Sequence, residues 1–354
     1  MVKILVLYDG KAGHLTQAMG AANLIRTRSP QPVSITTCIA KPRVKLFNRL
    51  TRLLVTLLPR PLLPLIKIFY SGNIASEPAD LVISFGGNSV ALNVALKRYW
   101  HSSNIAIGNR YGLACKFFDA AITMAGETAN PHSVASHIAL CKTDPHRAAK
   151  LGREFTTTQP AQKPIWSLLI GGNGSGYQYQ NSDWQKLAEA LVTLSHTHGV
   201  QWLITNSRRS GCASETTLKQ ALTDAVCLQT YFSGEGNLGD IEAIMAASER
   251  VFCTEDSLSM LTEAVALAKP VVTLRPETVY RKRVHSTAVE YMAGQGLITS
   301  MAIADLAEYR PQAHPVLKSY EAHLDEIYDQ LARLIQPITN RRISTFADSA
   351  VAVV

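Results

Sequence analysis

Short apolar runs alternate along the chain with amphipathic stretches whose apolar residues recur at helical spacing. In the first half the apolar runs lie at 2–8, 32–40, 81–85, 104–108 and 119–124. Runs of this length, bounded by glycine or polar residues, predict buried strands, and stretches between several of them predict helices. Strands that alternate with helices favour a parallel sheet with helices on its faces.

The same alternation starts again in the second half of the chain. It predicts strands at 165–172, 200–205, 225–232, 250–254 and 269–274, with helices between them. Ser182 and Gln185 have the spacing of a capping box and predict the start of the first of these helices. Two such series predict an α/β fold of two Rossmann-like domains that face each other across a cleft.

The expected domain boundaries follow from a polar stretch at 142–163, which contains two prolines and is predicted to be a linker. An N-terminal domain is then expected at 1–150 and a C-terminal domain at 163–310. A last helical stretch at 311–338 is expected to pack back on the first domain, before a tail at 339–354. A length of 354 residues fits two domains better than one.

Composition and charge narrow the classes of function. The chain is 47% hydrophobic and 18% charged, which excludes a disordered or fibrous protein. Its six cysteines are scattered without a C-x-x-C pair, a usage that fits a reducing cytoplasm and argues against a zinc ribbon. The net charge is +8, and residues 1–76 alone carry eleven Lys or Arg and one acid. This local excess predicts an anionic partner, although no nucleic-acid-binding motif is present.

The basic excess is concentrated at 41–72, which has seven Lys or Arg and no acid. Read as a helix from Lys45, the segment has a basic face of Lys45, Arg49 and Arg52. The opposite face is built of leucines that include Leu50, Leu54 and Leu57, and Pro59, Pro61 and Pro64 are expected to end the helix. Such a helix suits the surface of an anionic membrane, here the inner face of the cell membrane. The alternative is a core helix with a solvated basic edge.

The strongest local motif is TEDSLSMLTE at 254–263. A strand is predicted to end where the motif begins, and a helix to start at Asp256 or Ser257, at the carboxyl edge of a parallel sheet. Free N–H groups there, with the hydroxyls of Ser257 and Ser259, would bind a phosphate. Glu263 falls on the same face two turns later and can accept both hydroxyls of a ribose. The alternative is that Asp256 and Ser257 only cap the helix and that Glu263 is a surface charge.

Two further patterns belong to the same predicted edge. A glycine-rich loop, in which a backbone can approach a diphosphate closely, begins with Gly171, Gly172 and Asn173. The next strand ends in a polar stretch with paired arginines that can hold a phosphate, Ser207, Arg208 and Arg209. The agreement of three patterns at one edge carries more weight than any one of them.

The first domain has a comparable corner after its first strand. His14 or Asp9 is the candidate general base there, and a solvated loop histidine is the alternative. The expected acceptor-binding residues come from this loop and from a second one at the same edge: Gly10, Lys11, Gly13, Gln17, Gly87 and Asn88. No D-x-D motif occurs, and His196 and His198 have no Cys or acid cluster beside them, so no metal site is expected.

Several of these motifs together resemble a known family. They are G-K-x-G-H-x-x-Q at 10–17, LLIGG at 168–172, T-x-S-R-R at 205–209 and T-E-D-S-x-S-M-x-x-E-A at 254–264. The chain resembles the mitochondrial-fission-protein-like family of glycosyltransferases, which has many bacterial members and looks like a GT-B fold. Its second domain is similar to the lipid-linked N-acetylglucosaminyltransferase of peptidoglycan synthesis.

The resemblance implies roles for individual residues. Glu263 would bind the ribose, Ser257 and Ser259 would face the diphosphate, and Arg208 and Arg209 would hold phosphates. The remaining donor-site candidates are Gly171, Gly172, Asn173, Ser207, Glu255, Asp256 and Met260. Glu255 and Glu263 also match the E-x7-E spacing of many retaining enzymes, so inversion and retention both stay open, as does the acceptor.

The combined interpretation is a cytoplasmic glycosyltransferase, peripheral on the membrane, that needs no metal or cofactor. It would move a sugar from a nucleotide-sugar donor to a lipid-linked or cell-envelope glycan such as lipopolysaccharide. One alternative is an NADP-dependent oxidoreductase, because arginines follow a glycine loop and could bind a 2′-phosphate. Another is a non-catalytic membrane adaptor that keeps the fold.

Overall fold

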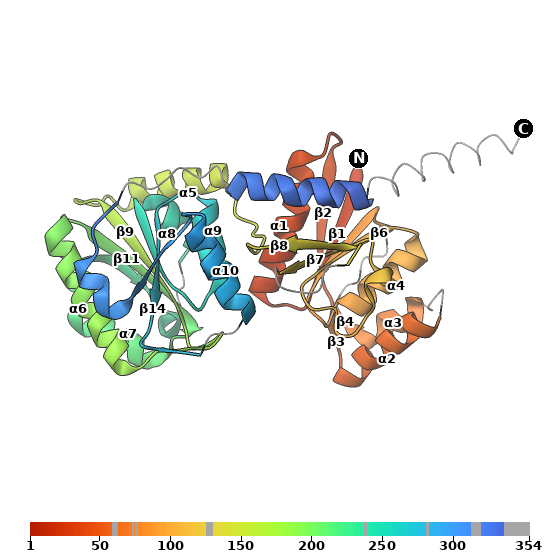
Figure 1. Cartoon of the computed structure of the whole chain (residues 1–354), viewed down its shortest axis with the longest axis horizontal. Helices are drawn as coiled ribbons and strands as arrows, with labels where there is room; N and C mark the ends of the chain where they lie inside the picture. The colour runs from red at the N-terminus through yellow and green to blue at the C-terminus, as the bar shows by residue number, and fades with distance from the viewer. Residues whose placement is uncertain are drawn as a thin grey trace, which may run out of the picture. The chain divides into compact units, whose positions relative to one another are not determined.

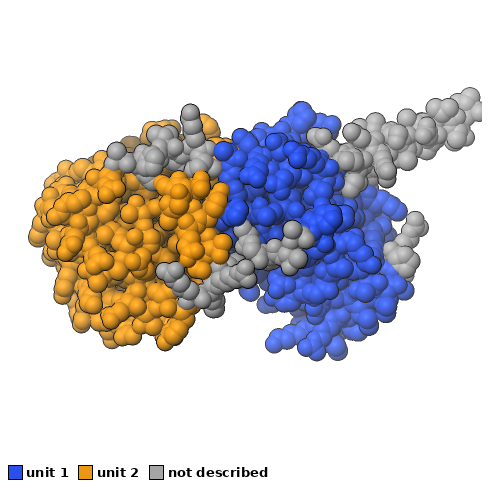
Figure 2. All heavy atoms as spheres, in the orientation of Figure 1, with its two compact units in different colours: residues 1–142, 322–354 blue, residues 143–321 orange. Residues whose placement is uncertain are grey.

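The structure is a computed structural model. It describes residues 1–58, 63–72, 74, 77–124, 130–236, 239–280, 283–312 and 320–335. The expected tail at 339–354, and Pro59 and Pro61, lie outside the described residues. The chain divides into two compact units (Figure 2). Unit 1 is Met1–Lys142 with Ala322–Val354, and unit 2 is Thr143–Glu321.

Unit 1 is built on one sheet of six parallel strands in the order β2-β1-β5-β6-β7-β8 (Figure 1). These strands are β1 (Val2–Tyr8), β2 (Val33–Ile39), β5 (Leu81–Phe85), β6 (Ser103–Ile107), β7 (Ala120–Met124) and β8 (Ser133–Ser136). A short antiparallel pair joins β3 (Lys41–Pro42) to β4 (Tyr70–Ser71). The five apolar runs predicted to be strands in the first half of the chain thus form β1, β2, β5, β6 and β7 of this sheet.

Helices cover both faces of this sheet. One face carries α1 (Ala12–Arg28) and the helical residues 320–335, whose Ile327 and Leu331 are buried beside Ile4 and Val6. The other face carries α2 (Lys45–Leu57), α3 (Leu63–Phe69) and α4 (Val90–Trp100), which share a second buried cluster. A 3-10 turn at Cys115–Phe117 leads to β7. The last described helix thus belongs to unit 1, although it is far from it in sequence.

Unit 2 repeats the plan with six parallel strands in the order β12-β11-β9-β13-β14-β16. They are β9 (Ile165–Gly172), β11 (Gln201–Arg209), β12 (Cys227–Tyr231), β13 (Arg250–Thr254), β14 (Val271–Arg275) and β16 (Thr299–Ala302). Its helices are α5 (Pro145–Thr158), α6 (Asn181–His198), α7 (Gly211–Ala221), α8 (Ile241–Ala247), α9 (Leu258–Ala266) and α10 (Arg283–Gly294). Minor elements are β10 (Tyr177–Gln178), β15 (Thr278–Val279) and 3-10 turns at Ser233–Glu235 and Ile303–Glu308.

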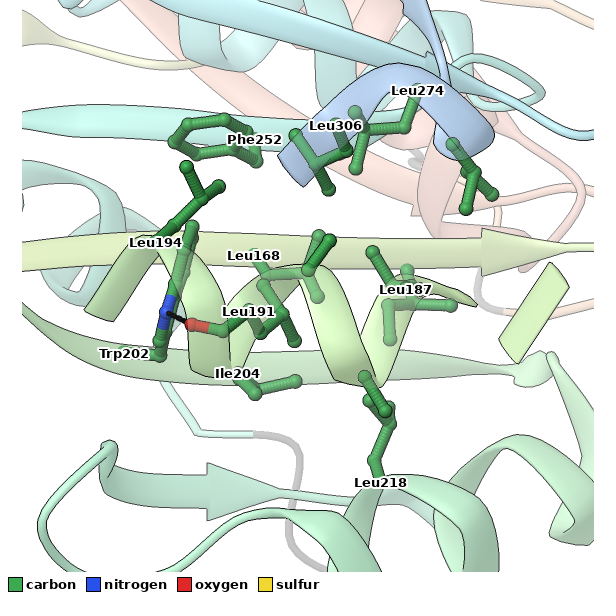
Figure 3. Packing of buried hydrophobic residues seen from close by; sticks show 14 of the residues in the cluster. Leu168, Leu187, Leu191, Leu194, Trp202, Ile204, Leu218, Phe252, Leu274 and Leu306 are labelled. Carbon is green, nitrogen blue, oxygen red and sulfur yellow. Dashed lines mark hydrogen bonds between the residues drawn. The ribbon is translucent and has the colours of Figure 1, made fainter. Parts of the chain in front are cut away.

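The core of unit 2 lies between α6 and the sheet. In Figure 3 the leucines of α6, among them Leu191, face Leu168, Ile204 and Phe252 of three neighbouring strands. Trp202 is fully buried there, and its indole N–H donates a hydrogen bond of 3.0 Å to the Leu191 carbonyl. This bond satisfies the only polar atom of the indole, so a large side chain can fill the core without leaving an unpaired donor.

Two local expectations differ from the structure. The stretch at 142–163, expected as a linker, contains α5, which begins at Pro145 and is capped by Asp144 through the N–H groups of His146 and Arg147. The helix packs on α8, and unit 1 ends at Lys142 rather than near residue 150. A proline at the first helical position and an Asp before it are helix-start signals, although the rest of the stretch is strongly polar.

The start of α6 is also different from the expected one. Its capping box uses Gln180 and Asp183, not Ser182 and Gln185. Asp183 is buried. Its carboxylate accepts a hydrogen bond of 2.8 Å from the Gln180 backbone N–H and another of 3.2 Å from the Glu277 backbone N–H. A buried carboxylate with two N–H donors fixes the helix start better than an exposed serine does.

Candidate active site

Both candidate sites lie at the point of their sheet where the strand order reverses. In unit 1 the chain runs from β1 outward to β2 and later returns to pair β5 on the other side of β1. In unit 2 β9 has the same position between β11 and β13. In open parallel sheets, ligands bind outside the carboxyl ends of the strands at this point. The expected residues of each domain follow these strand ends.

An ion pair occupies the reversal point of unit 2. Arg209 Nη2 at the end of β11 lies 2.9 Å from Asp256 Oδ2, which follows β13. The other oxygen, Oδ1, accepts hydrogen bonds from the Gly172 N–H at 3.2 Å and the Tyr179 hydroxyl at 3.3 Å. Asp256 is 2% exposed, whereas the Arg209 side chain is 45% exposed. The arginine can therefore reach solvent or a ligand while its carboxylate partner stays fixed.

Burial raises the pKa of Asp256 to about 6, although the Arg209 charge and hydrogen bonds from Gly172 and Tyr179 act in the opposite direction. Desolvation disfavours the charged form of a carboxyl group, and here it outweighs the attraction of the arginine. The carboxylate that holds Arg209 is thus maintained at an energetic cost, which is a common feature of functional sites.

This cost leads to a testable stability difference. Because the folded pKa of about 6 exceeds the reference value of 3.8, Asp256 lowers the free energy of unfolding as pH rises from about 4 to 6. We expect Asp256→Asn to stabilise unit 2 by up to about 3 kcal/mol at pH 7. At pH 4 the difference should vanish, because the aspartic acid is then protonated.

Thermal unfolding of the two proteins at pH 4 and pH 7 measures this effect. Asp305→Asn, at an exposed position of the same unit, is the matched control and should change neither midpoint. An Asp256→Asn variant that is less stable than the parent at pH 7 would show that the ion pair with Arg209 outweighs desolvation.

The glycine loop after β9 serves this ion pair. A β-carbon at Gly171 would collide with the Asp256 carboxylate, and one at Gly174 would collide with the Arg209 guanidinium. Gly172 has a φ of +111°, and a β-carbon there would meet the Arg209 backbone. The sequence pattern predicts that these glycines leave room for a diphosphate. In the structure the room beside Gly171 and Gly174 is filled by protein atoms.

The N-terminus of α9 lies directly beside Asp256. Ser257 is the N-cap residue, and its side chain makes no capping hydrogen bond. Asp256 directs its carboxylate to Gly172, Tyr179 and Arg209, so the alternative in which these two residues only cap the helix is wrong. Half-buried Ser259 and Met260 follow in the first turn, whose N–H groups have no acceptor within the helix. This end of α9 can accept an anion.

Glu263 is half-buried one turn after Ser259, on the same face of α9. Cys253 lies near the end of β13. Burial raises the pKa of the Cys253 thiol well above its usual range, and the charges of Asp256 and Glu263 raise it further, while that of Arg209 lowers it.

The other expected donor residues are differently placed. Glu255 is buried, and its carboxylate accepts hydrogen bonds from Tyr177 at 2.9 Å, Ser300 at 2.9 Å and Thr273 at 3.2 Å. It joins β10, β13, β14 and β16, which is a structural role. The Glu255 member of the E-x7-E pair thus directs its carboxylate to protein hydroxyl groups.

Three polar expectations at the glycine loop can be placed individually. The Asn173 side chain accepts the Tyr179 backbone N–H at 2.7 Å and closes the loop. The Ser207 hydroxyl donates to the Gly171 carbonyl, and Arg208 is exposed. The sequence motifs do not include Tyr179, although its hydroxyl contacts Asp256. A tyrosine three residues after the end of a glycine loop is the only signal that could have indicated it.

The corner of unit 1 contains a histidine–carboxylate pair. His14 Nδ1, at the start of α1, lies 2.7 Å from Asp9 Oδ1. Asp9 Oδ2 accepts a hydrogen bond of 3.1 Å from Asn88, and Lys11 Nζ lies 3.9 Å from it. Burial alone would raise the pKa of Asp9, but the charge of His14 and the hydrogen bonds from His14 and Asn88 hold it below its usual value. A carboxylate that is charged at neutral pH favours the tautomer with the proton on Nδ1, which leaves Nε2 as the nitrogen that can accept a proton.

The neighbouring loops support this pair. His14 packs on Phe85, with ring centroids 4.5 Å apart. The side chain of Asn48 in α2 donates to the Gly87 carbonyl at 3.1 Å, which ties α2 to the loop that holds Asn88. The structure thus brings His14, Asp9, Lys11 and Asn88 together.

The remaining acceptor expectations lie around this corner. Gly10 is exposed with a φ of +89°, and Gly13 and Gln17 are half-buried on the first turns of α1. Gly87 is buried. A β-carbon there would overlap the ring of Tyr111, which therefore covers this glycine.

The sequence profile of the mitochondrial fission ELM1 family matches residues 12–335. This chain belongs to that family. The match extends over both units and includes His14, Arg209 and the whole of α9. Among curated proteins, no sequence matches this ELM1-family chain.

Solved structures show the fold of this ELM1-family chain. The UDP-GlcNAc 2-epimerase of Methanocaldococcus jannaschii is similar over 89% of this chain and 94% of its own, with 9% identity and a TM-score of 0.54. The ADP-heptose LPS heptosyltransferase II of E. coli is similar over 94% of this chain and 99% of its own, with 11% identity and a TM-score of 0.47. The UDP-GlcNAc 2-epimerase of Neisseria meningitidis, bound to UDP-GlcNAc, covers 98% and 100%, with 11% identity and a TM-score of 0.46. The fold is the GT-B fold of two Rossmann-like domains, as expected.

The described residues of the ELM1-family chain contain neither a membrane-spanning helix nor a metal-binding cluster. A helix able to cross a bilayer needs about 20 apolar residues, and the described part of the chain contains none. The same residues hold no group of three His, Cys, Asp or Glu side chains that could bind a metal ion.

Proposed function

We propose that this chain is a glycosyltransferase that moves a sugar from a nucleotide-sugar donor to an acceptor hydroxyl. The observation that carries the proposal is the edge of unit 2, where Asp256 holds Arg209 beside the N-terminus of α9 at the reversal point of the sheet, with Glu263 one turn further along that helix. A helix N-terminus and an exposed arginine suit a diphosphate, and a carboxylate on the next turn suits a ribose. The similar epimerase of Methanocaldococcus jannaschii is named for a UDP-sugar, which agrees with this donor class.

In the proposed reaction, the diphosphate binds at the N–H groups of the first turn of α9, with Ser257, Ser259 and Arg209. The acceptor oxygen attacks the anomeric carbon, and the bond from that carbon to the phosphate oxygen breaks. The bonding electrons leave with the nucleoside diphosphate, whose charge the helix terminus and Arg209 stabilise. This arrangement supplies positive charge to the leaving group from the protein's own residues.

The proton of the acceptor hydroxyl passes to His14 Nε2. Of the two candidate bases, His14 fits better, because both oxygens of Asp9 already accept hydrogen bonds and its pKa is low. Asp9 then orients the imidazole and stabilises the imidazolium that forms, as the carboxylate of a catalytic triad does. A single displacement assisted by one base inverts the anomeric centre.

A thermal-shift panel tests the donor class. It contains UDP-, ADP- and GDP-sugars, the free nucleoside diphosphates, and NADP. A ligand present at one hundred times its Kd stabilises the folded state by about 2.7 kcal/mol, so a true donor should raise the midpoint clearly. Stabilisation by NADP alone would favour the oxidoreductase, and a flat panel would favour the adaptor. The contacts of Gly171 and Gly174 speak against NADP, because protein atoms fill the space next to these glycines.

We further propose that the enzyme is peripheral on the inner face of the cell membrane and acts on a lipid-linked acceptor. Helix α2 buries Asn48, Thr51 and Val55 in unit 1. Its leucines face outward: Leu46, Leu53 and Leu57 are 58%, 53% and 68% exposed. Leu50 and Leu54 are half-buried, so they form the edge of this face rather than its centre. Exposed leucines next to Lys45 and Arg49 suit an anionic bilayer.

Charge reversal tests the membrane proposal. Replacing Lys45, Arg49 and Arg52 with Glu should reduce binding to anionic vesicles by at least 100-fold, because each basic residue near such a surface contributes about 1 kcal/mol. Co-sedimentation with vesicles measures the change, and 0.5 M salt should reproduce part of it in the parent protein. Binding that survives both treatments would show that electrostatic attraction is not the anchor.

A further inference from the structure

A small cavity lies beside the leucine face of α2. It has a volume of about 290 Å³ and is lined by Arg49, Arg52 and Thr56 of α2 and by Tyr111 and its neighbours. Exposed Leu53 forms part of its wall. A cavity of this size is at the lower end of the range for ligand sites, which suits a headgroup rather than a whole cofactor.

The charge of this cavity is not compensated by the protein. Within the described part of the chain, no carboxylate forms an ion pair with Arg49 or Arg52. Arg52 Nη1 donates to the Tyr111 carbonyl at 2.7 Å, and its Nε is buried without an acceptor among the described residues. A buried donor without a partner is costly, and an anion in the adjoining space would reduce that cost. Two guanidinium groups are typical ligands of a phosphate, whereas the Thr56 hydroxyl already donates to the Arg52 carbonyl at 2.8 Å.

The cavity is connected to the corner of unit 1 through Tyr111. This residue has a φ of +50°, and the Asn109 side chain holds its backbone N–H at 2.7 Å. Its ring covers Gly87, and the next residue, Asn88, donates to Asp9. The cavity therefore shares a wall with the loop that orders the histidine–carboxylate pair. An L-residue in the left-handed region is rare, and Tyr111 lines this cavity from that conformation.

We propose that this cavity binds the phosphate of a lipid in the bilayer on which the leucine face of α2 rests. The site would hold the phosphate of a lipid-linked acceptor, or of a lipid beside it, next to the loop of Asn88. The proposal rests on the membrane-associated transferase described above and adds a specific site to it. Non-specific attraction between basic residues and an anionic surface requires no such site. An experiment that compares individual basic residues can therefore distinguish non-specific attraction from binding at a phosphate site.

The test compares single charge removals on one helix. Binding is measured with vesicles of phosphatidylcholine that contain 20% phosphatidic acid, and with phosphatidylcholine alone. Lys45→Gln removes a charge outside the cavity and should weaken binding about fivefold, the value of one basic residue at an anionic surface. Arg52→Gln and Arg49→Gln should weaken it about 50-fold. Arg49 is exposed, so its loss does not endanger folding.

Arg52→Lys keeps the charge and removes the planar fork, so it should still bind about tenfold more weakly than the parent, because only the fivefold contribution of the charge remains. Equal losses for Lys45→Gln, Arg49→Gln and Arg52→Gln, or full binding by Arg52→Lys, would overturn the site. Glycerol 3-phosphate distinguishes the sources of the phosphate. If it stabilises the parent in thermal unfolding but does not displace it from vesicles, the site takes a soluble phosphate, and the lipid assignment is wrong.

The nucleotide panel is repeated on each variant. An unchanged shift with the donor, together with lost vesicle selectivity, supports the lipid site. A donor shift without any difference between the variants on vesicles rejects the lipid site and leaves the transferase standing. A parent without a donor shift rejects the transferase, and the vesicle comparison then still decides whether the cavity binds a lipid phosphate.

Discussion

Replacing His14 with alanine is expected to lower turnover by roughly 10²- to 10⁴-fold and to leave donor affinity unchanged. The reason is the geometry of the corner of unit 1, where Asp9 accepts from Nδ1 at 2.7 Å and leaves Nε2 as the basic nitrogen. Without this base, the acceptor hydroxyl must lose its proton to water. Initial rates at saturating donor, with donor affinity from the thermal shift, measure the two quantities separately.

His196→Ala is the matched control, because this histidine is exposed on α6 of unit 2 and should have no effect. Asp9→Asn should retain part of the activity, since an amide can still contact the imidazole but no longer stabilises its charged form. Two results would contradict the assignment of His14. One is a loss of donor affinity at constant turnover, and the other is a product with retained anomeric configuration.

Glu263→Ala should weaken donor binding about 10- to 100-fold without unfolding unit 2. A hydrogen bond between a carboxylate and a ribose hydroxyl is charge-assisted and contributes about 1.5–3 kcal/mol. The residue is half-buried near the end of α9, so its removal leaves no large cavity. The affinity for the nucleoside diphosphate should fall as much as that for the nucleotide sugar, because both contain the ribose.

Glu189→Ala, at an exposed position of α6, is the control for the loss of one negative charge from unit 2. A Glu263→Ala variant that binds both nucleotides as well as the parent does would show that Glu263 does not bind the ribose. A variant that loses only the nucleotide sugar would place Glu263 against the sugar instead.

The sequence by itself determined the class of fold and the location of the two candidate sites. Apolar runs such as 2–8 and 81–85 form parallel strands with the same ends, β1 and β5. The alternation of period-two and helical patterns is a local property, because it depends on which face of each element is buried. Parallel strands place their carboxyl ends together, so the sequence pattern is sufficient to assign His14 and Asp256 to sheet edges.

Only the tertiary structure decided what these residues contact. The glycines at 171 and 174 accommodate Asp256 and Arg209, and Glu255 is an internal anchor, although its spacing from Glu263 suggests a ligand. The sequence pattern of α2 does not show which face is buried. The structure buries Asn48 and Thr51 and exposes Leu46, Leu53 and Leu57. Such outcomes depend on contacts between residues that are far apart in the chain, and the free energy of these contacts outweighs local preference.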